Sequence, residues 1–242
     1  MNKYFIGLLL LGVSLFVPVS ASAALVVVDP IGRYTYNVLG ADSEIALLPS
    51  EKPDIEIKKA GFNAVTSKMA IALFKDADKV LLSIKDDAGT TKADVTGYKD
   101  TVIEISAKND AESVFIGVSD GGFTITQDGV DATTSYEISV DPAKRAVYLS
   151  APSGERILSL FPRDAIDALV KTNMITANPA SIALTETETG DLTYEVHATR
   201  DIAPFGLITY GVPRVIAVSA VNGKVLHIED PLWFRVLSFL FV

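Results

Sequence analysis

Residues 161–170 read FPRDAIDALV, residues 191–196 read DLTYEV, and residues 215–226 read VIAVSAVNGKVL. The first segment places apolar side chains three and four residues apart behind Pro162, a residue that suits the first turn of a helix, so it predicts a short amphipathic helix. The other two segments predict strands, and the pair Asn222-Gly223 predicts a hairpin turn within the second. This stretch therefore predicts a helix followed by an antiparallel meander.

This order of elements, from Phe161 to Glu229, resembles the PepSY family of small extracytoplasmic modules. The parts that match are the helix, the strand LTYEV at residues 192–196 and the final hairpin VNGKV at residues 221–225. The chain departs from the family in the long insert Ala198–Gly211, and in Ser219–Val221, where the family has an acidic residue before the turn. The resemblance implies an α+β module that restrains a peptidase or binds another partner.

Upstream of this stretch, short apolar runs recur at even spacing and are separated by turns rich in Gly, Asp and Asn. Such a pattern predicts a β-sandwich, with the immunoglobulin-like sandwich as one form. The cysteine and tryptophan landmarks of immunoglobulin domains are missing, because the chain has no cysteine and its single tryptophan is Trp233. We expect a mainly β protein with a C-terminal α+β part, its upstream strands lying at Met69–Phe74, Val80–Ile84, Val102–Ile105, Ser113–Val118, Phe123–Thr126 and Tyr136–Val140.

The first 23 residues have the form of a secretory signal peptide. Lys3 supplies the positive charge, an apolar segment follows, and Ala21-Ser22-Ala23 fits the small-residue rule for cleavage. The alternative is a membrane-spanning anchor, which needs about 20 apolar residues and so fits this shorter run less well. We expect an extracytoplasmic protein, secreted or at the cell surface, with a β-sandwich domain at residues 24–135, a PepSY-like domain at 136–230 and an apolar tail at 231–242.

Charge and cysteine content limit the classes of partner. Without Lys3 the chain has 20 basic and 30 acidic residues, an excess of negative charge that opposes binding to nucleic acids. The absence of cysteine means that an exported form relies on its hydrophobic core rather than on disulfides, and it excludes attachment of a lipid to an N-terminal cysteine.

The tail after Pro231 is the most apolar segment downstream of the signal peptide. Twelve residues of helix rise about 18 Å, which is too short to cross a hydrocarbon core of about 30 Å. The tail is therefore either a helix or strand docked on the β-structure, a membrane-surface anchor, or a docking segment for another protein. The residues that we expect to contact a partner or a membrane are Leu232, Trp233, Phe234, Val236, Leu237, Phe239 and Leu240.

One sequence motif has the form of a hydrolase nucleophile. Residues 117–121 read GVSDG and fit G-x-S-x-G around Ser119, and both histidines, His197 and His227, follow it. In hydrolases this serine lies where a strand turns into a helix, but here residues 122–126 read GFTIT and predict another strand. We therefore interpret Ser119 as part of a β-turn, with a serine hydrolase as a remote alternative.

Metal and cofactor motifs give no prediction of a site. Two histidines without cysteine leave a zinc site dependent on distant carboxylates, and no H-E-x-x-H spacing is present. Acidic turns at Asp86-Asp87, Asp120, Asp128 and Asp131 could offer oxygen ligands to calcium, but the chain has no EF-hand loop pattern. No glycine-rich phosphate loop is present, so we expect no cofactor.

Taken together, these patterns predict an exported, non-enzymatic protein that binds another protein or modulates a peptidase in the cell envelope. A structural or adhesive surface protein whose β domains act as spacers explains the same features. The identity of the partner and the oligomeric state are not encoded in any motif of this chain.

Overall fold

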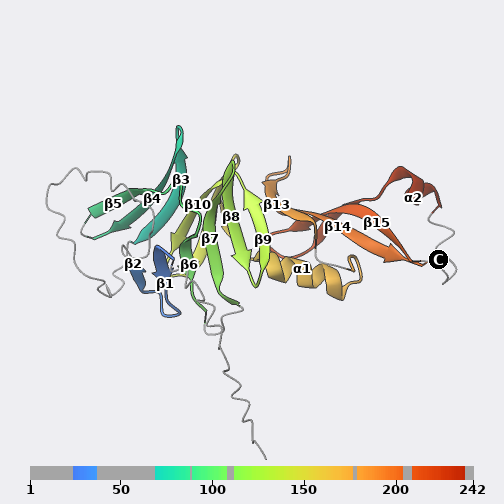
Figure 1. The fold of residues 1–242 in the computed structure, drawn as a ribbon, viewed down its shortest axis with the longest axis horizontal. Coiled ribbons are helices and arrows are strands. Elements are labelled where there is room, and N and C mark those ends of the chain that lie inside the picture. The colour runs from blue at the N-terminus through green and yellow to red at the C-terminus, as the bar shows by residue number, and fades with distance from the viewer. Residues whose placement is uncertain are drawn as a thin grey trace, which may run out of the picture.

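The computed structural model describes residues 24–36, 69–87, 89–107, 112–176, 179–203 and 209–237. These residues form sixteen strands and two short helices, arranged in two sheets along an elongated molecule (Figure 1). The expected mainly β fold is therefore confirmed. Residues 1–23, where we expect a signal peptide, lie outside the described residues.

The larger sheet contains ten strands and runs along most of the molecule. Its neighbours pair antiparallel, except that β1 is parallel to β6 and β13 is parallel to β9. The strand order, from one edge to the other, is β16 (Val225–Glu229), β15 (Tyr210–Ser219), β14 (Leu192–Ile202), β13 (Ser181–Glu186), β9 (Val130–Thr134), β8 (Gly122–Gln127), β7 (Val114–Ser119), β6 (Thr101–Ile105), β1 (Val26–Val28) and β2 (Tyr34–Tyr36).

The smaller sheet contains six antiparallel strands. Their order is β12 (Gly154–Leu158), β11 (Ala146–Ala151), β10 (Glu137–Asp141), β3 (Ala70–Asp76), β4 (Lys79–Asp86) and β5 (Gly89–Asp94). Strand β5 was not expected, because its sequence GTTKAD lacks apolar alternation and most of its side chains are exposed.

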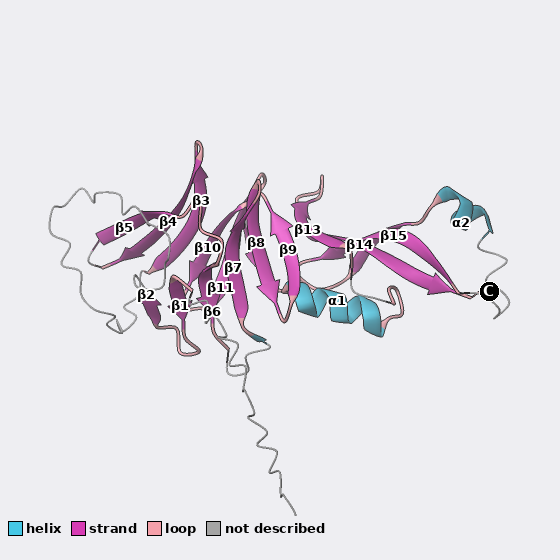
Figure 2. Ribbon diagram, in the orientation of Figure 1, coloured by secondary structure: helices cyan, strands magenta, loops and turns pink. Residues whose placement is uncertain are grey.

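Both sheets contribute alternate apolar side chains to one core. Ile71 and Leu73 of the smaller sheet and Phe123 and Ile125 of the larger sheet are fully buried, and they belong to the same cluster. The two sheets therefore form a sandwich over part of their length (Figure 2). Strands β6 to β9 follow one another as a meander, whereas immunoglobulin sandwiches use Greek-key connections.

The hairpin between β7 and β8 depends on two glycines. Gly121 has a φ of +88°, a conformation that side chains with a Cβ rarely adopt. A Cβ at Gly122 would lie 2.1 Å from the carbonyl oxygen of Thr134 on the next strand. The close approach of β8 to the end of β9 is thus possible only with glycine.

The expected helix is present as α1 (Pro162–Lys171), and its buried face carries Pro162, Ala165, Ile166 and Leu169. The preceding residue, Phe161, provides no side-chain cap, and the amide of Arg163 donates instead to the Gln127 side-chain oxygen at 3.2 Å. Just beyond the helix, Asn173 has a φ of +54°, and the Met174 amide donates to the Leu169 carbonyl, which closes the C-terminal end of α1. This helix packs against β8 and β9 on one side of the larger sheet (Figure 1).

Hydrogen-bonded pairing crosses the domain boundary that we expected at residue 135. Strand β10 pairs with β3, and β13 pairs with β9, so each sheet contains strands from both sides of that position. The division into domains at residues 24–135 and 136–230 stays a prediction. Each of the two sheets contains strands from both of these parts.

The expected strands after α1 are present, but the last turn is longer than a two-residue hairpin. Residues 220–224 connect β15 to β16, and Gly223 has a φ of +71°. The Ala220 amide donates to the Leu192 carbonyl of β14, so the chain stays hydrogen-bonded to β14 for one residue beyond the end of β15 before it turns. The predicted position of the Asn222-Gly223 turn is right, and its length was underestimated.

The insert Ala198–Gly211, where it is described, extends the β14–β15 hairpin. The register continues from Ala198 opposite Arg214 to Ile202 opposite Tyr210. This extension reaches away from the sandwich, and the second helix, α2 (Leu232–Leu237), lies at the same end of the molecule (Figure 1). Strand β5 lies toward the opposite end.

Candidate functional site

The exposed apolar side chains near the C-terminal end gather on α2 and on the end of the β14–β15 hairpin. We call Tyr210, Leu232, Trp233 and Val236 the end surface; their exposed fractions are 55%, 76%, 41% and 70%. Phe234, on the same helix, is buried. Of the expected contact residues, the side chain of Leu237 and all of Phe239 and Leu240 lie outside the described part of the chain.

The aromatic rings fix the position of α2 against the hairpin. The Trp233 ring lies edge-on to Tyr210, with centroids 5.7 Å apart, and edge-on to Phe234 at 5.8 Å. Tyr210 belongs to the insert and was not expected at this surface. The sequence around Tyr210 does not indicate a contact with the tail. Tyr210 reaches α2 only because β15 pairs with β14.

A second contact holds the start of α2. The amides of Phe234 and Arg235 donate to the Pro231 carbonyl at 2.9 and 3.1 Å, which forms the first turn. Just before it, Asp230 accepts from the Arg214 guanidinium, with Nη2 at 2.7 Å and Nε at 2.9 Å. The Arg214 side chain is only 4% exposed, and its Nη1 also donates to the Met174 carbonyl at 3.1 Å.

Arg214 therefore joins three segments: strand β15, the loop after α1, and the approach to α2. Strand β16 ends at Glu229, opposite Val215; Pro231 follows the end of β16, and Pro213 lies within β15, two residues before Val215. Because proline cannot donate to a ladder, pairing stops there and the chain turns into α2. The ion pair then fixes the direction in which the helix leaves the sheet.

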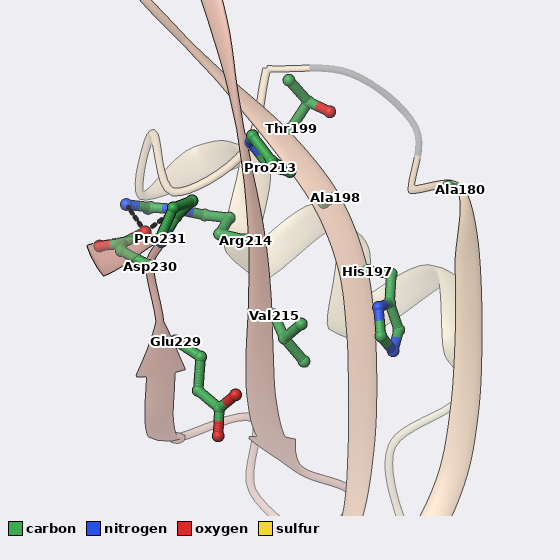
Figure 3. Close-up of a pocket in the computed structure, with 10 residues that line it drawn as sticks. All are labelled: Ala180, His197, Ala198, Thr199, Pro213, Arg214, Val215, Glu229, Asp230 and Pro231. Carbon is green, nitrogen blue, oxygen red and sulfur yellow. Dashed lines mark hydrogen bonds and ion pairs between the residues drawn. The ribbon is translucent and has the colours of Figure 1, made fainter. Parts of the chain in front are cut away.

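An open hollow of about 390 Å³ lies beside this junction (Figure 3). It is lined by Ala180, His197, Ala198, Thr199, Pro213, Arg214, Val215, Glu229, Asp230 and Pro231. Besides Arg214 and Asp230, its ionisable groups are His197 on β14 and Glu229 on β16, which flank Val215 of β15 in the register.

The two histidines are each paired with a glutamate on their own strand. His197 Nε2 lies 2.9 Å from Glu195 Oε1, and His227 Nε2 lies 3.4 Å from Glu229 Oε1. The two pairs are separated by strand β15, so about 10 Å of sheet lies between them. Among the described residues no group of three or more ligating side chains could hold a metal ion.

Ser119 ends strand β7 and pairs with Gly122 across a two-residue turn, as the β-turn interpretation predicted. A strand follows it, not the helix of a nucleophile elbow. His197 is four strands away in the sheet, about 19 Å, and His227 is six strands away, about 29 Å measured along the sheet. The structure therefore brings neither His197 nor His227 close to Ser119.

The acidic turns considered as calcium ligands interact with protein groups. Asp86 accepts from Tyr34 Oη and from the Gly89 amide, both at 3.0 Å. Asp131 accepts from Thr126 at 2.7 Å, and Asp128 lies 3.8 Å from the Arg163 guanidinium. These contacts act within the fold, and the carboxylates are not assembled around a common point.

The chain gives no match to any family model, and a search of the curated proteins also gives no match. The PepSY resemblance rests on the order of α1 and strands β14 to β16, and it stays a prediction. In the described ranges, no helix is long and apolar enough to cross a membrane.

Proposed function

We propose that this protein is an exported, non-enzymatic binding module of the cell envelope and that it holds its partner with the end surface. The observation that carries the proposal is the exposure of Tyr210, Leu232, Trp233 and Val236 on one end of an elongated fold. The signal-peptide pattern at residues 1–23 supports export.

The end surface differs from the scattered exposed apolar residues elsewhere. Burying a Val, Leu or aromatic side chain is favourable by about 1.5–3 kcal/mol, so a cluster left in water is an unused source of binding energy. The same helix buries Phe234, whose ring lies against Trp233, while Leu232, Trp233 and Val236 stay exposed.

The anchoring supports a binding role over a passive end. The buried Arg214 guanidinium pairs with the partly exposed Asp230 at the base of α2, so the helix is held in one orientation before any partner arrives. A surface held in this way loses less conformational entropy on binding than a free tail would.

The proposal is tested by co-sedimentation with an envelope preparation from the cell of origin. Replacing Leu232 and Val236 together by serine should abolish sedimentation and leave the melting temperature unchanged, because both side chains are exposed. Ile31→Ser is the matched control, since Ile31 is 71% exposed but lies in the turn between β1 and β2. Equal sedimentation of all three proteins would refute the proposal and favour the spacer alternative.

A further inference from the structure

We propose that the end surface contacts the interfacial region of an electrically neutral lipid bilayer. This inference rests on the proposed function and names the partner for the same surface. It follows from the size of the surface, its chemistry and the charge of the chain.

A bilayer makes fewer demands on the surroundings of the end surface than a folded protein does. Four side chains with these exposed fractions present roughly 400–500 Å², the size of the largest patch on an ordinary monomer. A stable interface with a folded protein, including a second copy of this chain, buries about 800 Å² on each side, nearly half of it polar, so the polar surface around these side chains would also have to match the partner. A bilayer needs no matching surface, because its acyl chains and headgroups rearrange around the inserted side chains.

The chemistry of the end surface matches the boundary between headgroups and acyl chains. Trp233 and Tyr210 each combine an apolar ring with one hydrogen-bonding group, the combination that is enriched at membrane interfaces. Leu232 and Val236 add aliphatic side chains on the same helix.

Charge decides which lipid is favoured. The chain has a formal net charge of −9, which opposes approach to an anionic surface. Close to the end surface, the Asp230 carboxylate is paired with Arg214, so it adds little negative charge there. A zwitterionic surface therefore suits this protein better than an anionic one.

The test uses the purified protein and protein-free phosphatidylcholine vesicles, with the emission of Trp233 as the signal. Because Trp233 is the only tryptophan, its emission reports on the end surface alone. We expect a blue shift that saturates with lipid. Partitioning should fall about a hundredfold or more in the double variant Leu232→Ser/Val236→Ser, because each side chain contributes a factor of about ten or more. Ile31→Ser should partition like the unmodified protein.

Four results would overturn the inference, and they differ in whether the proposed function survives. Sedimentation with the envelope but no response to vesicles would show a partner other than lipid, so the inference fails and the proposed function stands. An emission change that depends on protein concentration without lipid would show self-association. Stronger partitioning into phosphatidylglycerol than into phosphatidylcholine at low salt would refute the choice of a neutral surface. Binding to neither vesicles nor envelope would refute both proposals.

Discussion

Replacing Arg214 by methionine should destabilise the protein and release α2. The guanidinium is almost fully buried and makes three hydrogen bonds, two to Asp230 and one to the Met174 carbonyl. Methionine keeps much of the apolar stem but leaves both acceptors without their donor. Breaking a buried ion pair costs about 3–5 kcal/mol, and Asp230 keeps partial access to water, so we expect about 2–4 kcal/mol.

Urea unfolding followed by circular dichroism measures the free energy of unfolding, and Trp233 emission reports on α2 in the same samples. The expected loss corresponds to a fall in melting temperature of roughly 4–16 °C for a protein of this size. The emission of Trp233 should also shift to the red before global unfolding, because the helix has lost its attachment at Asp230. Arg200→Met is the matched control: Arg200 is exposed on the same hairpin, so its loss should change the stability by less than about 0.5 kcal/mol.

A double-mutant cycle separates the ion pair from the packing of the stem. The combined variant Arg214→Met/Asp230→Asn should be more stable than the sum of the single changes predicts, by about 1 kcal/mol or more. Additive effects, or an Arg214→Met protein as stable as the control with unchanged Trp233 emission, would refute the role of this pair as the attachment of α2.

Three further predictions concern the core and the response to acid. Gly122→Ala should cost about 3 kcal/mol or more in urea unfolding, because the added methyl group meets a backbone carbonyl of the next strand; a loss below 1 kcal/mol would contradict the close approach. Tyr194→Phe should cost about 1–3 kcal/mol, because the buried Tyr194 hydroxyl donates to the Leu160 carbonyl at 2.7 Å, and an unchanged unfolding midpoint would argue against that bond. Hydrogen bonds from Thr96 hold the pKa of the Asp94 carboxyl below its ordinary value of 3.8, so its contribution to stability is present above pH 3.8 and is lost as the pH falls through the lower folded pKa. Asp94→Asn should therefore show a smaller fall in melting temperature between about pH 5 and pH 2.5 than the unmodified protein, and an equal fall would contradict this assignment.

The sequence predicts elements whose local pattern agrees with their final environment. Helix α1 has apolar residues at helical spacing behind Pro162, and β7, β8 and β10 alternate apolar and polar side chains, so each was found near its expected position. Strand β13 was not expected, although Ile182 and Leu184 alternate correctly, because only two apolar residues mark it. Which sheet a strand joins also depends on distant pairing, such as β10 with β3, and no local pattern encodes it.

For the candidate site, too, the local sequence predicts the element but not its environment. The apolar run after Pro231 identified α2 as an element of interest, and the sequence left open whether its side chains are core or exposed. That outcome depends on Tyr210 and Arg214, which strand β15 brings to the helix from outside the tail. The fold buries Phe234 and leaves Leu232 and Val236 exposed, a split that an almost uniformly apolar segment cannot reveal by periodicity.

Acrylamide quenching of Trp233, in the purified protein and again with envelope membranes, tests the central claim most directly. We expect efficient quenching of the purified protein, because the indole is partly exposed on the end surface, and clear protection when membranes are added. A tryptophan already protected in the purified protein, with no change on adding membranes, would mean that the tail belongs to the core and that the end surface is not a binding surface.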